Sequence, residues 1–104
     1  MLRIYSVILE VIPKIVPALT AIQRHDPDLA RQGRRALTSM PLNTAEGSYS
    51  RGRNRGARYN TAAASGNELI AVLETSVAMG YLEPQDPAVI DTLRRIVGTL
   101  YKNT

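Results

Sequence analysis

The chain has 104 residues, with 13 basic and nine acidic side chains and a formal net charge of +4. This length predicts one domain covering residues 1–104. Because the chain contains no Cys, disulfides and Cys-containing zinc sites are excluded. Phe and Trp are also absent, so the core must be built from aliphatic residues, Met and Tyr, which favours a helical bundle over a β-sandwich.

The first predicted helix covers residues 3–24. Its apolar residues recur at helical spacing, at Tyr5, Ile8, Ile12, Ile15, Leu19 and Ile22. Further apolar residues lie beyond this stripe, which indicates a helix buried on more than one face. The second face is either a subunit interface or the flank of a long central helix. We expect Pro13 and Pro17 to bend the helix without ending it.

The same segment raises the question of a membrane. Glu10, Lys14 and two prolines interrupt it. It therefore fits neither a transmembrane helix, which needs roughly 20 mostly apolar residues, nor the uncharged centre of a secretory signal. We expect a cytoplasmic protein without a targeting segment or membrane contact.

The second helix is predicted to begin at Asp26-Pro27, since Asp is a strong N-cap and Pro suits the first helical position. Pro41 removes one backbone hydrogen bond. Either the helix continues through Pro41 with a kink, or it stops near Met40 and restarts with Asn43 as N-cap. The first alternative, a nearly continuous helix to about residue 49, is favoured.

Residues 50–54 form the clearest predicted loop, and a third helix is expected over residues 55–79 with Gly80 as its C-terminal cap. Asp86-Pro87 repeats the earlier helix-start signal and begins the fourth helix. The predicted fold is therefore all-α, an antiparallel up-down four-helix bundle kinked at its prolines.

Charge is unevenly distributed along the chain. Residues 24–58 hold eight arginines and three acids, whereas residues 59–104 hold three basic residues and five acids. The basic region is a candidate anion-binding face, and a solvated helix face is the alternative interpretation. The candidate nucleic-acid-binding residues are Arg31, Arg34, Arg35, Arg51, Arg53, Arg55 and Arg58.

No catalytic constellation is recognisable. The one histidine, His25, is predicted at an exposed turn, and no Glu-x-x-His motif is present, so a di-iron site is not expected. Nucleophile-elbow, Walker and dinucleotide-binding patterns are absent as well. We expect no metal, no cofactor and no enzymatic activity.

Four polar residues are predicted to have structural roles. Glu46 and Glu68 are expected to pair with arginine or backbone donors at a helix contact, because a buried carboxylate needs such a partner. Asn43 and Asn67 are expected to satisfy backbone groups near Pro41 and Gly66. The candidate partners of the two glutamates are Arg34, Arg35 and Arg58.

Several motifs together resemble a known family. The run Arg35-Ala36, followed by Ser39-Met40-Pro41-Leu42-Asn43-Thr44-Ala45-Glu46-Gly47, is similar to the signature R-R-A-x-x-S-I-P-x-N-I-A-E-G. The same family has counterparts of a segment in the third predicted helix, which contains Tyr59 and then Ala64-Ser65-Gly66-Asn67-Glu68-Leu69. It also has a counterpart of the turn Met79-Gly80-Tyr81-Leu82. This is the 23S rRNA intervening-sequence protein, or "four helix bundle protein", family, which is similar to the accessory variability determinant of diversity-generating retroelements. The chain departs from the family pattern at Met40 and Thr44, where the family has Ile, and in the reversed order of Ser65-Gly66. The family's usual Trp-x-x-Ala-type segment is also absent from the first helix.

The resemblance implies an antiparallel four-helix bundle that assembles into a homopentameric ring. In the retroelement relative, a basic surface engages nucleic acid and a reverse transcriptase. We therefore expect a non-enzymatic oligomer that binds RNA or DNA through arginine–phosphate contacts, without sequence readout. The alternative is a protein–protein scaffold or accessory subunit, holding a partner such as a polymerase.

Overall fold

The computed structural model describes residues 2–104 and confirms the all-α fold. Its helices are α1 (Ile4–Gln23), α2 (Pro27–Tyr49), α3 (Arg53–Ala78) and α4 (Pro87–Lys102). The predicted boundaries agree to within one residue except at the α2–α3 turn. There α3 begins two residues earlier than predicted, so Asn54 belongs to the helix and the loop is shorter than expected.

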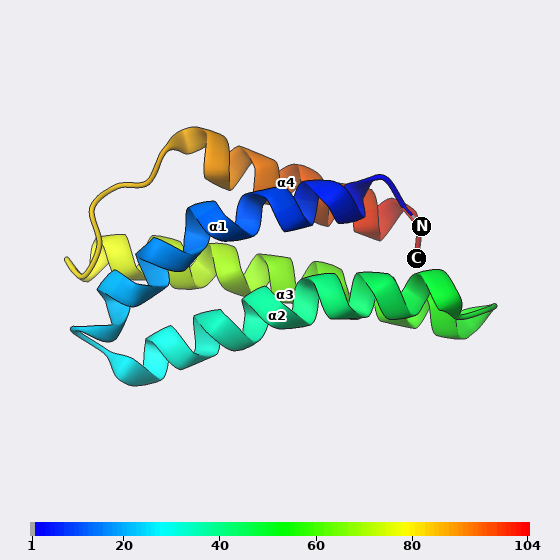
Figure 1. The fold of residues 1–104 in the computed structure, drawn as a ribbon, viewed down its shortest axis with the longest axis horizontal. Coiled ribbons are helices and arrows are strands. Elements are labelled where there is room, and N and C mark those ends of the chain that lie inside the picture. Colours follow the sequence, from blue (N-terminus) through cyan, green and yellow to red (C-terminus); the bar gives the residue numbers. More distant parts are fainter. Residues whose placement is uncertain (1) are drawn as a thin grey trace.

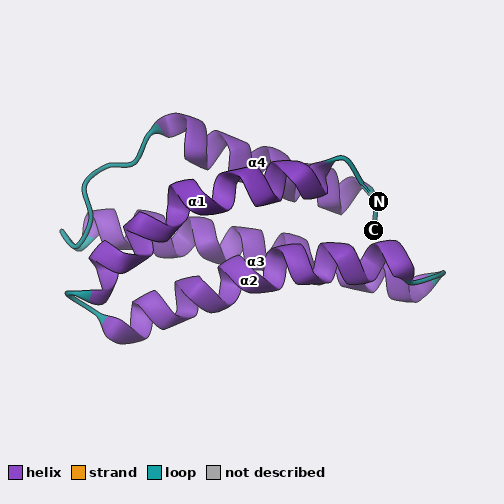
Figure 2. Cartoon of the chain, viewed as in Figure 1, coloured by secondary structure: helices purple, strands orange, loops and turns teal. Residues whose placement is uncertain are grey.

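Successive helices run in opposite directions, and both chain termini lie at one end of the bundle (Figures 1 and 2). Each helix packs against its neighbours in sequence, and α1 also packs against α4, which closes the bundle. The molecule measures 43 × 25 × 19 Å along its principal axes. One end therefore carries the α2–α3 turn with the termini, and the other carries the α1–α2 turn and the α3–α4 connection.

The helix α1 continues without a break through Pro13 and Pro17. Both prolines are exposed, whereas the residues that face the other helices are buried. Each proline lacks the N–H that would bond to the carbonyl four residues earlier, and solvent can hydrate the freed carbonyls on this outer side. The buried stripe consists of Ile4, Ile8, Val11, Ile15, Ala18, Leu19 and Ile22.

The helix α2 begins as predicted, since the Asp26 carboxylate accepts a hydrogen bond from the Leu29 amide at 3.0 Å. It then continues through the buried Pro41 to Tyr49. The alternative of a helix that stops near Met40 and restarts at Asn43 is therefore wrong. The kink at Pro41 stays a prediction, as do the bends in α1.

Glycines set the distance between helices at three contacts. A Cβ atom on Gly47 would lie 2.5 Å from the ring of Tyr59, one on Gly33 would lie 2.6 Å from Leu19, and one on Gly66 would lie 2.7 Å from Val97. Real Cβ atoms essentially never approach so closely, so a side chain at any of these positions would force the contacted side chain or its helix to shift. Gly66 ends the small-residue run Ala62-Ala63-Ala64-Ser65-Gly66 of α3, and here α4 approaches closely.

Gly80 ends α3 with the predicted cap. Its φ is +79°, in the left-handed region that glycine adopts without a Cβ penalty. The Tyr81 amide donates to the Ser76 carbonyl and the Gly80 amide donates to the Val77 carbonyl, which is the Schellman pattern. An extended connection then leads to Asp86, whose carboxylate caps α4 at the Ala88 amide.

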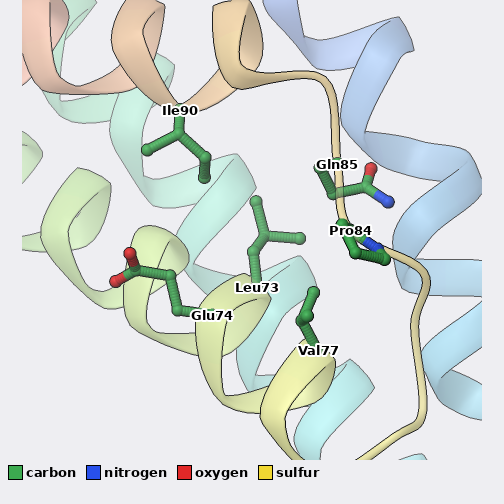
Figure 3. A pocket seen from close by; sticks show the side chains of 6 residues that line it. All are labelled: Leu73, Glu74, Val77, Pro84, Gln85 and Ile90. Carbon is green, nitrogen blue, oxygen red and sulfur yellow. The ribbon is translucent and has the colours of Figure 1, made fainter.

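Hollows flank α4 on both sides. One, of about 240 Å³, lies between α3, the connection and α4, and Figure 3 shows Leu73 and Val77 directed toward Pro84 and Ile90 there. The other, of about 210 Å³, lies between α1 and α4, with Val7 and Thr92 among its lining residues. The first half of α4 thus lies between two hollows.

By length and composition, α1 could cross a membrane. The same property is found in core helices of soluble proteins, and about a third of its most apolar window is buried within this bundle. The absence of membrane contact stays a prediction.

Candidate nucleic-acid interface

The α2–α3 turn gathers four of the predicted arginines at one end of the bundle. Arg51 lies in the turn, and Arg53, Arg55 and Arg58 lie in the first two turns of α3, all with exposed side chains. Gly52 allows the tight reversal, because its φ of +60° is unfavourable for other residues. We call these four residues the arginine tip.

Two members of the arginine tip are fixed by the protein itself. Arg55 Nε donates to the carbonyl oxygens of Ser50, at 3.1 Å, and Gly47, at 3.3 Å. The Ser50 carbonyl lies just beyond α2, and the Gly47 carbonyl, which also accepts from the Ser50 amide, lies in its last turn, so Arg55 ties the start of α3 to the end of α2. Arg58 Nη1 donates to Asn43 Oδ1 at 3.3 Å, so its guanidinium is held against α2.

Arg51 and Arg53 are free. No hydrogen bond or ion pair within residues 2–104 engages either side chain. The start of α3 adds positive potential, since Gly52 provides no side-chain cap and the first turn contains no acid. A mainly polar hollow of about 390 Å³ adjoins it, lined by Ser50, Asn54, Ala57, Arg58 and Thr61.

The other three predicted arginines are elsewhere. Arg31, Arg34 and Arg35 lie in the first half of α2, and about 22 Å of helix separates Arg34 from Tyr49 at the other end. Arg31 pairs with Asp28, and Arg34 donates to Gln23 Oε1 at 2.9 Å. Within one protomer, the seven arginines therefore form two groups rather than one.

The expected pairing of Glu46 or Glu68 with an arginine or backbone donor is wrong. Both carboxylates are exposed, and the ion pairs among residues 2–104 are Arg31–Asp28 and Arg94–Glu74. Both glutamates lie on the outer sides of their helices, where water solvates the carboxylate and no partner is required.

Asn43 and Asn67, the two asparagines with predicted structural roles, both make polar contacts, one within its own helix and one with a neighbouring helix. Asn43 Nδ2 donates to the Ser39 carbonyl at 3.0 Å, close to Pro41 as expected. Asn67 Nδ2 instead reaches the Tyr101 hydroxyl on α4, at 3.4 Å, so its predicted bond to a backbone group near Gly66 is wrong.

A hydrogen-bonded seam joins α2 to α3, and the sequence alone did not indicate it. Ser65 Oγ donates to Ser39 Oγ at 2.8 Å, and Asn43 Nδ2 donates to the same Ser39 oxygen at 3.0 Å. Arg58 continues the chain of bonds from Asn43 to the surface. The seam thus connects the interior of the helix contact to the arginine tip.

An exposed apolar face covers parts of α1 and α2. Leu9 is 46% exposed, Val16 38% and Leu42 65%. A mostly apolar groove of about 370 Å³ lies between the two helices, lined in part by Ile12 and Pro41. The second apolar face predicted for α1 therefore exists. Ile8, in contrast, is fully buried inside the bundle.

His25 and the acidic side chains are the candidate metal ligands of this chain. Among residues 2–104, no three His, Asp or Glu side chains come close enough to hold a metal ion. His25 is exposed at the α1–α2 turn, as predicted, and stacks on Tyr81 with ring centroids 5.3 Å apart. This stacking joins the two connections at that end of the bundle.

No family model matches the chain, and no curated protein or solved structure matches it either. The resemblance to the intervening-sequence proteins consequently stays a prediction from the motifs.

Proposed function

We propose that this protein is a non-enzymatic helical bundle that binds RNA or DNA through the phosphate backbone, with the arginine tip as its contact surface. The supporting observation is that Arg51 and Arg53 are exposed, free of partners and adjacent to the uncapped start of α3. Guanidinium groups bind phosphate oxygens in a bidentate manner, and such contacts carry no sequence information.

The family resemblance supports the same proposal. Under it, the protein is a cytoplasmic member of the intervening-sequence protein family. Its metal-free bundle contributes a basic surface rather than a catalytic site. Arg31, Arg34 and Arg35 belong to this surface only if assembly brings them next to the arginine tip of another copy.

Self-association, as the pentamer that the family resemblance implies, is the second part of the proposal. It is supported by the exposed apolar face of Leu9, Val16 and Leu42. Leu42→Lys should weaken self-association while the fold is retained, because the side chain already faces solvent in the protomer. Analytical ultracentrifugation at micromolar concentration measures the effect. A parent protein that is a stable monomer would exclude this part of the proposal.

The salt dependence of binding tests the nucleic-acid contact. Replacing both Arg51 and Arg53 by Ser should weaken binding to unrelated RNA and DNA sequences alike. Each phosphate contact removed should lower the slope of log K against log salt by about 0.7–0.9. The double variant removes charge without removing any intramolecular bond, which makes it cleaner than replacement of all four arginines.

The fourfold replacement of Arg51, Arg53, Arg55 and Arg58 by Ser should weaken binding further while helical content is retained. Arg95→Ser provides a single-charge control, since this arginine is also exposed but lies on α4, outside the predicted basic region. If the parent binds neither RNA nor DNA at low salt, or if the fourfold variant binds as well as the parent, the nucleic-acid proposal fails. The scaffold alternative, with the apolar face as its contact, would then lead.

A further inference from the structure

Tyr49 is the most exposed large apolar side chain of residues 2–104, with 81% of its surface accessible. It is the last residue of α2 and is followed directly by Ser50-Arg51-Gly52-Arg53. Within residues 2–104, no hydrogen bond engages its hydroxyl group. An aromatic ring is therefore presented to solvent within four residues, along the sequence, of two free guanidinium groups.

The backbone that carries Tyr49 is fixed. The Ser50 amide donates to the Gly47 carbonyl at 3.2 Å, and Arg55 Nε bonds to carbonyls on both sides of Tyr49 in the sequence. The ring consequently stands on an ordered helix end rather than on a mobile loop. The terminal amino groups of Arg55 take no part in these bonds and stay available to a phosphate.

This combination fits one kind of ligand. Proteins that bind single-stranded nucleic acid pair cationic groups along the backbone with aromatic rings on which bases stack. In a duplex, the bases are already stacked on one another and cannot use such a ring. We infer that Tyr49 is a stacking platform for an unpaired nucleobase, so that the arginine tip prefers single strands to duplexes. This inference rests on the proposed function.

The test compares variants of Tyr49 on defined oligonucleotides of equal charge, as RNA and as DNA. Tyr49→Ala and Tyr49→Leu should weaken binding to single strands about 5- to 150-fold, the range for loss of one stacked base. Tyr49→Phe, which keeps the ring, should bind like the parent. Binding of all variants to a duplex, and to an abasic strand of the same length, should equal that of the parent.

A second measurement reports on the ring directly. Because the chain contains no Trp, Tyr49→Trp introduces a single indole. Its fluorescence should be quenched by a base-containing strand and not by the abasic strand. The affinity of Arg51→Ser should fall equally for both strands, which separates the phosphate contact from the stacking contact.

The outcomes are distinct. If the parent binds single strands but Tyr49→Ala and Tyr49→Leu bind them equally well, the inference is wrong and the proposed function stands. If Tyr49→Ala changes the oligomeric mass, the ring belongs to a contact between copies of the chain, since Leu42 lies on the same side of α2, and the inference is again wrong. If the parent binds no probe, both the inference and the proposed function fail.

Discussion

The contact between α3 and α4 at Gly66 can be tested by adding one methyl group. In Gly66→Ala, the new Cβ would lie 2.7 Å from Val97 Cγ2 and 3.4 Å from Met40 Sδ. Val97 is buried and β-branched, so its side chain has little freedom to move away. Overpacking of this kind costs about 1–3 kcal/mol.

The intrinsic preference of helices for Ala over Gly acts in the opposite direction, by about 1 kcal/mol. Gly98→Ala is the matched control, because it also lies within a helix and its Cβ would meet nothing within 4 Å. We expect Gly98→Ala to stabilise the protein by about 1 kcal/mol. The difference in unfolding free energy between the two variants removes the propensity term and should equal the overpacking cost, about 1–3 kcal/mol.

Urea denaturation followed by circular dichroism measures this difference, at one protein concentration because self-association would shift the midpoint. In the background of Val97→Ala, which removes Cγ2, Gly66→Ala should lose most of its penalty. If Gly66→Ala stabilises the protein as much as Gly98→Ala does, the close approach of α3 and α4 is wrong.

Two further predictions concern charged side chains. Asp26→Ala should lower the unfolding free energy by about 0.5–2 kcal/mol, because the cap on α2 is lost. Asp26→Asn should lower it less, since Asn also caps helices well. Thermal denaturation compares the two variants. Glu46→Gln and Glu68→Gln should each change the unfolding free energy by less than about 0.5 kcal/mol, because both side chains are exposed and unpaired. A loss of several kcal/mol in either variant would show that its carboxylate has a partner after all.

The features that the sequence predicted well are local. Asp26-Pro27, Asp86-Pro87 and Gly80 fix helix ends through bonds that span only two to five positions. The early start of α3 was missed because Gly52 caps the helix without a side chain, so no polar residue marks the boundary.

Contacts between helices were harder to predict. The bond between Ser65 and Ser39 depends on how α2 and α3 face each other, and two serines alone give no sign of it. The same uncertainty explains the error at Glu46 and Glu68, whose outward positions follow from the packing of neighbouring residues. The position of Tyr49, two residues before Arg51, is a signal that the sequence contains, but only the structure shows that its ring is exposed.

The two hollows beside α4 have a consequence for motion. Local opening requires less free energy where fewer apolar contacts must be broken. With a hollow on each side and an extended connection before it, the first turns of α4 should separate from the bundle before the rest of the molecule unfolds. Amide hydrogen exchange should therefore be fastest among the helix interiors in the first half of α4. The amides of α2 and α3 around the seam of Ser39 and Ser65 should exchange slowest, at a rate set by global unfolding.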